Sequence, residues 1–119
     1  MCDDAGSASV LAAAMIGVLV MCAMAGASVG AAVIARHRAQ AAADLGALAA
    51  AGALIAGPDA ACTQAAAIAS AMRTTVAQCR VDGLDVVLTV HAEVRLGRWG
   101  IGPATAVARA GPSETASAA

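Results

Sequence analysis

The sequence predicts an α+β protein: a long N-terminal transmembrane helix continues into a small extracytoplasmic domain with a second short helix and a three-stranded antiparallel sheet. Three observations lead to this prediction. Residues 5–35 contain no charged side chain. Strong helix formers then continue as far as a Gly57-Pro58 step, and beyond Thr75 the apolar residues recur at every second position.

The apolar run is long enough to cross a bilayer. A helix over residues 5–35 would extend about 46 Å, against a hydrocarbon core of about 30 Å. A cleaved secretory signal is the alternative, but it has an apolar region of only about 7–15 residues after a basic start. Here the start, Met1-Cys2-Asp3-Asp4, is acidic. We therefore favour an anchor, with residues 1–6 as a candidate leader, a long helix over 7–57 and its transmembrane part at about 8–35.

The helix is expected to continue past the membrane surface and to end at Gly57-Pro58, because glycine suits a left-handed cap and proline cannot extend the hydrogen-bond ladder. Within it, Leu45, Leu48 and Ile55 are spaced to share one face. Asp59 is expected to cap the second helix. The predicted inner positions of that helix are Ala61, Ala65, Ile68, Met72 and Val76.

Alternation of apolar and polar residues predicts the strands. In the first strand the expected inward residues are Ala77, Cys79 and Val81, and Asp82-Gly83 is expected to form a tight hairpin turn. In the second strand they are Leu84, Val86, Leu88, Val90, Ala92, Val94 and Leu96. A third strand is predicted at 104–110, which completes a head at 58–110, and the Pro-, Ser-, Thr- and Ala-rich tail at 111–119 is expected to be disordered.

Two of the four cysteines, Cys62 and Cys79, belong to the head and form the natural pair. A bridge between them would stabilise the head by about 3 kcal/mol and would place it outside the cytoplasm. Two buried free thiols in a cytoplasmic domain are the alternative. The charge distribution also favours a cytoplasmic C-terminal head, since Arg36 and Arg38 follow the apolar run and Asp3 and Asp4 precede it. We give the cysteines more weight than this small charge bias.

Few residues suggest chemistry. Cys22, Gly26 and Gly30 form a small-residue stripe that suits helix packing in lipid, although an alanine-rich chain produces such stripes by chance. His91 and Glu93 share a polar strand face, and a solvated face is favoured over a metal site because structural zinc sites normally use four ligands. No GxSxG, phosphate-loop or HExxH motif is present, so neither an enzyme nor a cofactor is predicted.

Composition narrows the partners. Hydrophobic residues make up 61% of the 119 residues and charged residues 13%, whereas a soluble domain averages about 45–50% and about 25%. The net charge is −1 with no basic stripe, which disfavours nucleic-acid binding. The bilayer is therefore the first partner expected, and no small-molecule substrate is predicted.

A family resemblance extends over nearly the whole chain. Gly6-Ser7 before the apolar run, and above all Arg36, Arg38, Gln40 and Asp44 after it, resemble TadE-like pseudopilins. Cys62, Cys79 and the segment 80–87 are similar to the actinobacterial TadE-like group encoded near a helicase and secretion genes.

The resemblance implies a minor subunit of a tight-adherence (Flp) type IV pilus or related secretion machine, with other pilin-like subunits and assembly proteins as partners. It also implies membrane localisation and prepilin cleavage after Gly6, with Ser7 as the first mature residue. Pilin-type sites carry glutamate at the fifth mature position, which is Leu11 here. The alternative is a stand-alone anchored module that presents its sheet to an envelope partner, with Gly6 uncleaved. An enzyme using a metal on His91 and Glu93 is a third hypothesis.

Overall fold

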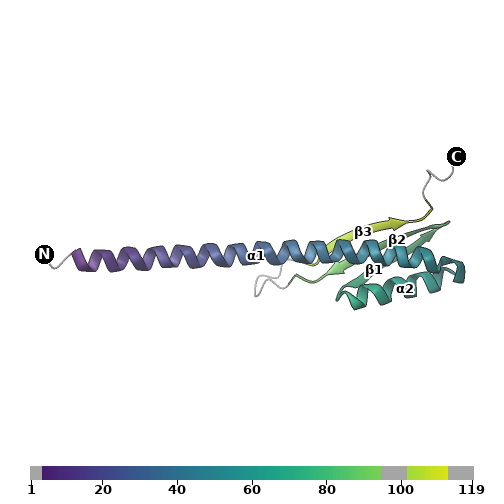
Figure 1. The fold of residues 1–119 in the computed structure, drawn as a ribbon, viewed down its shortest axis with the longest axis horizontal. Helices are drawn as coiled ribbons and strands as arrows, with labels where there is room; N and C mark the ends of the chain where they lie inside the picture. The colour runs from purple at the N-terminus through teal and green to yellow at the C-terminus, as the bar shows by residue number, and fades with distance from the viewer. Residues whose placement is uncertain (1–3, 95–101, 113–119) are drawn as a thin grey trace.

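One helix runs through the length of the protein in the computed structural model, which describes residues 4–94 and 102–112 (Figure 1). This helix, α1 (Asp4–Ala53), has a bare N-terminal half and a C-terminal half covered by the rest of the chain. The molecule measures 85 × 33 × 17 Å. By length and composition, the segment Gly6–Ala56 holds the one candidate membrane span among the described residues.

The long helix ends at the predicted Gly57-Pro58 step. A single 3-10 turn, η1 (Leu54–Ala56), follows α1, and Gly57 then takes a φ of 109° that favours glycine. The second helix, α2 (Pro58–Ala71), has Gly57 as its N-cap and Pro58 in its first turn. The prediction that Asp59 caps α2 is therefore wrong. Proline's fixed φ suits the first helical position, so the helix begins before Asp59, which lies in its first turn.

A Schellman motif ends α2, with arginine at the position where glycine is usual. Arg73 has a φ of 56°; its N–H bonds to the Ser70 carbonyl at 3.0 Å, and the Thr74 N–H bonds to the Ala69 carbonyl at 2.9 Å. The buried Thr74 hydroxyl also donates to Ala69, at 2.9 Å. A left-handed conformation costs a residue with a Cβ about 1 kcal/mol. This turn allows the chain to pass from helix to strand within three residues.

Three antiparallel strands form the sheet, in the order β1-β2-β3. They are β1 (Thr75–Asp82), β2 (Asp85–Ala92) and β3 (Ala104–Ala110), so the α+β prediction is confirmed. Asp82 pairs with Asp85, which makes Gly83 and Leu84 the two loop residues, with a positive φ at Gly83. The predicted turn is thus shifted by one residue, and Leu84 is exposed in the loop rather than buried on the strand.

A bulge in β1 changes which residues face inward. The pairing with β2 shifts between Val76 and Gln78, so Ala77 is the extra residue. Val76 and Cys79 are half-buried whereas Ala77 is exposed. The prediction of an inward Ala77 is therefore wrong, because strict alternation fails across a bulge.

The core of the head pairs large side chains on the sheet with small ones on the helix. Val86, Leu88 and Val90 of β2 are fully buried. The facing stripe of α1 is almost entirely alanine, namely Ala35, Ala39, Ala42, Ala43, Ala47 and Ala50. Gly46 continues this stripe, and a Cβ on it would lie 2.6 Å from Cδ2 of Leu88. The helix therefore packs closely on the sheet because its contact face carries almost no side-chain bulk.

Leu45, Leu48 and Ile55, whose spacing predicts one shared helix face, are all exposed. Leu45 is 53% exposed and Leu48 66%, and Ile55 is fully exposed on η1. We call Leu45 and Leu48 the outer face of α1. Inward leucines at this helix would hold it away from β2, where Leu88 already fills the space.

A disulfide joins Cys62 of α2 to Cys79 of β1, across 17 residues and a Cα–Cα distance of 5.9 Å. The predicted pairing is confirmed, and the alternative of two free thiols does not hold. The bridge ties α2 to the strand on the edge of the sheet. Residues 1–3 of the candidate leader, Leu96 of the second predicted strand and residues 113–119 of the predicted disordered tail lie outside the described residues.

Candidate functional site

Among the described residues, most of the exposed large apolar side chains lie on the bare half of α1. Its large side chains there are about half or more exposed, on every side of the helix: Val10, Leu11, Met15, Ile16, Val18, Leu19, Val20, Met21, Met24, Val29, Val33 and Ile34. Water does not favour such a surface, whereas lipid or other helices would cover it. A surface of this kind is typical of a membrane anchor or of a helix packed in an assembly.

The predicted packing stripe lies on this surface and is open. Cys22 is exposed as a free cysteine, and a Cβ added to Gly26 or Gly30 would meet no atom within 4 Å. The candidate processing residues, Gly6 and Ser7, lie in the first turns of α1. Helix packing through the stripe and cleavage after Gly6 both stay predictions.

The four residues that carry the family resemblance are all exposed on α1. The Gln40 side-chain amide donates to the Asp44 carboxylate at 3.0 Å, one helical turn away. Arg36 and Arg38 line two different clefts where the head meets the bare half of the helix. This stretch therefore marks the junction between the two halves of α1.

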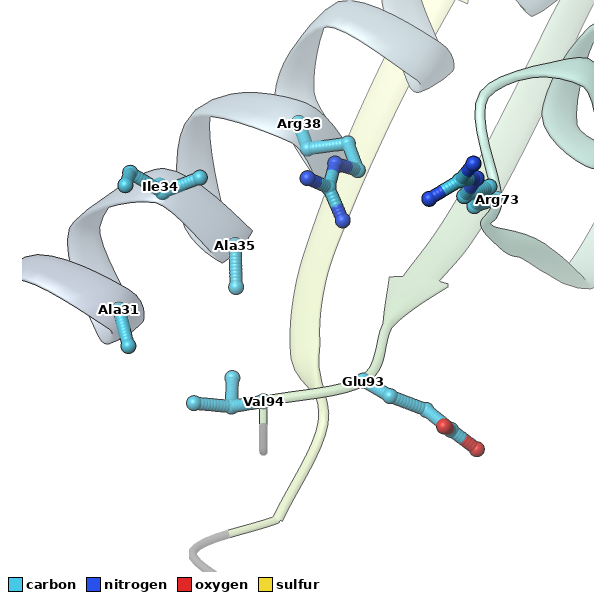
Figure 2. A pocket seen from close by; sticks show the side chains of 7 residues that line it. All are labelled: Ala31, Ile34, Ala35, Arg38, Arg73, Glu93 and Val94. Carbon is cyan, nitrogen blue, oxygen red and sulfur yellow. The ribbon is translucent and has the colours of Figure 1, made fainter. Parts of the chain in front are cut away.

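The cleft at Arg38 has a volume of about 510 Å³ and lies between α1 and the end of the head nearest the bare half of α1. Figure 2 shows its lining: Ala31, Ile34, Ala35 and Arg38 from α1, with Arg73, Glu93 and Val94 from the head. We call this cavity the Arg38 cleft. A second cleft of about 540 Å³ holds Arg36 and also has Val94 in its lining. Each cleft thus combines apolar helix residues with an arginine.

Sequence reasoning did not identify Arg73 as a site residue. It is separated from Arg38 by 35 positions, and only the folding of α2 back along α1 brings both to one cleft. The sequence signal that could have drawn attention to Arg73 lies in the short passage from helix to strand. A helix that gives way to a strand within three residues needs a left-handed residue, and no glycine is present there.

The two residues of the metal hypothesis, His91 and Glu93, lie at the C-terminal end of β2 and just beyond it. His91 lies on β2, where its carbonyl accepts a hydrogen bond from the Thr75 hydroxyl at 3.5 Å, and Glu93 lies past the strand end. Across residues 4–94 and 102–112, no three His, Cys, Asp or Glu side chains gather closely enough to hold a metal ion. The ion pair between Asp85 and Arg109 lies at the opposite end of β2 and β3.

These features define a class of protein: an α+β chain with a long, bare apolar helix and a small head stapled by one disulfide. Residues 6–53 match the family model described as "Putative Flp pilus-assembly TadE/G-like". Over this segment, which is almost all of α1, the chain is similar to the TadE/G-like pilus-assembly family, and the predicted resemblance is confirmed.

One curated relative resembles this chain closely over part of its length. It is the protein named "Apoptosis inhibitor Rv3654c" of Mycobacterium tuberculosis, 63% identical over 54 residues. The match covers 45% of this chain and 64% of that protein. No solved structure matches the chain.

Proposed function

We propose that the protein is a minor, pilin-like structural subunit of a tight-adherence pilus or a related secretion apparatus. The observation that supports this most is the coincidence of the family match with α1: residues 6–53 match, and α1 spans Asp4–Ala53. What the chain shares with the family is therefore its helix, and the N-terminal half of this helix exposes its large apolar side chains instead of burying them.

The proposed action is packing, without catalysis. The bare half of α1 would sit in the bilayer before assembly and among the helices of other pilin-like subunits afterwards, with no refolding of the head. Head-to-tail contacts between different surfaces produce open helical assemblies of this kind. The disulfide supports a head outside the cytoplasm, because such bonds persist in oxidising compartments. Neither a nucleic acid nor a small-molecule substrate is part of the proposal.

A first test is the intact mass of the protein from its native host, measured with and without thiol reduction. We expect a chain that begins at Ser7 and gains the mass of two hydrogens at Cys62 and Cys79 on reduction. This expectation is based on two small residues, Gly6 and Ser7, which lie at the start of the helix that the family match covers. A full-length mass would contradict processing, and a mass unchanged by reduction would contradict the bridge.

A second test addresses the outer face of α1. In the native host, Leu45→Asp with Leu48→Asp is expected to reduce the protein in the sheared, assembled surface fraction by about tenfold or more. Burying unpaired carboxylates in a helix contact costs several kcal/mol, and each 1.4 kcal/mol is about a factor of ten. Both leucines are exposed in the free chain, so its fold and disulfide should persist.

The matched control is Leu84→Asp, the same chemical change at an exposed position of the hairpin loop. It should leave the assembled fraction unchanged. An equal loss in both variants would point to a general defect, and no loss in the double variant would exclude the outer face from assembly.

The alternative is a stand-alone anchored module whose head binds an envelope partner. It is favoured by one observation: the family match ends at residue 53, so the head lies outside it. In that case full-length protein would stay in the membrane fraction with Gly6 uncleaved. The relative's name ascribes apoptosis inhibition to that protein.

A further inference from the structure

We propose that the Arg38 cleft binds the phosphate of an anionic lipid headgroup, in the leaflet from which the head emerges. This inference rests on one part of the proposed function, the membrane anchoring of α1. It assigns to Arg38 and Arg73 a role that assembly by helix packing does not require.

The charges of the cleft favour an anion. Arg38 and Arg73 both line it, against one carboxylate, Glu93. Within the described residues the one salt bridge is that between Arg109 and Asp85, so neither arginine has a carboxylate partner there. Figure 2 shows the two guanidinium groups directed toward the same space, with the Glu93 carboxylate pointing away from them. Paired guanidinium groups suit phosphate oxygens because each presents a planar fork of N–H donors.

The position of the cleft along α1 favours a lipid as the source of that anion. At about 1.5 Å per residue, residues 8–35 extend about 42 Å, which matches a bilayer of about 40–45 Å including its headgroups. Ala31, Ile34 and Ala35 would then lie in the headgroup layer, with Arg38 at its outer edge. Ala31, Ile34 and Val94 provide the apolar wall that an acyl chain requires, beside the cationic wall of the two arginines.

The backbone at Arg73 is a further argument for a role of its side chain. The residue has a φ of 56°, in the left-handed region that glycine adopts without strain. A glycine would end α2 with the same Schellman hydrogen bonds and less strain. Arginine at this position is explained if its guanidinium group is used, and in the structure that group lines the cleft.

The test uses the full chain in phosphatidylcholine vesicles that carry a trace of spin-labelled lipid. The motionally restricted fraction of the label gives the association of phosphatidylglycerol relative to phosphatidylcholine. We expect a preference for phosphatidylglycerol of about fivefold for each arginine that contributes, and its loss in Arg38→Gln with Arg73→Gln. Arg38→Lys with Arg73→Lys should recover part of this preference, because lysine restores the charge without the planar fork of N–H donors.

The matched control is Arg80→Gln, which removes the same charge from the exposed outer side of β1 and should leave the preference intact. Non-reduced mass and helix content check the fold of every variant. The single variant Arg38→Gln, at an exposed helix position, provides a second reading if the double variant does not fold.

Three results would overturn the proposal. An unchanged preference in the double variant would exclude the cleft as the lipid site. Loss of the preference on adding inorganic phosphate at constant ionic strength would identify free phosphate as the ligand. Failure of the wild-type chain to float with vesicles would overturn the anchoring itself, and with it the proposed function, whereas the first two results leave that function intact.

Discussion

Leu88→Ala is expected to lower the free energy of unfolding of the head by about 2–5 kcal/mol, as large-to-small core substitutions do. Leu88 is fully buried at the centre of β2, and the neighbouring α1 stripe offers only alanines and Gly46. Small neighbours cannot extend into the vacated space, so the cavity should stay open. Urea titration of the full chain in mild detergent, followed by hydrogen exchange of the β2 amides, measures the loss.

Leu84→Ala is the matched control for this substitution. Leu84 is 69% exposed in the hairpin loop, so the same truncation there should change stability by no more than about 0.5 kcal/mol. If the β2 amides exchanged as slowly in Leu88→Ala as in this control, α1 would have moved toward the sheet to fill the cavity. The inference that α1 already lies in close contact with β2 would then be wrong.

Removing the disulfide with Cys62→Ala and Cys79→Ala is expected to destabilise the head by about 3 kcal/mol. The bridge closes a loop across 17 residues, and it restricts the unfolded chain by about that amount in the chain-entropy model. A head this small has little core in reserve, so a large part of the population should be unfolded. The same urea titration, repeated on the wild type with and without reductant, should show the same loss.

Cys22→Ala provides the control, because Cys22 is an exposed free cysteine on the bare half of α1. Its unfolding transition should coincide with that of the wild type. An equal midpoint for the double alanine variant and the oxidised wild type would mean that the core holds the head without the bridge.

Several elements of the fold were predictable because their causes are local. Glycine and proline at 57 and 58 end the long helix, and alternation over eight residues produces β2. Glycine at 83 permits the two-residue loop that brings β1 against β2. The cysteine pairing followed from the small number of candidates in the head.

Other features were not predictable from periodicity. An alanine-rich helix shows no contrast between its faces, so the leucines were the natural markers of a buried side, yet they are exposed. The bulge at Ala77 depends on the pairing of two strands, and the sequence there has no glycine that would indicate a bulge.

The order of the elements, the length of the apolar run and the disulfide follow from the sequence, since each depends on residues close in the chain or on a forced pairing. The face of α1 that meets the sheet, and the position of Arg38 and Arg73 in one cleft, depend on the packed fold and are seen only in the structure. The reason is steric. The bulk of Leu88 and its neighbours on β2 selects the smallest face of the helix, and this choice of face turns the leucines outward. The return of α2 along α1 then brings Arg73 to the cleft that Arg38 lines.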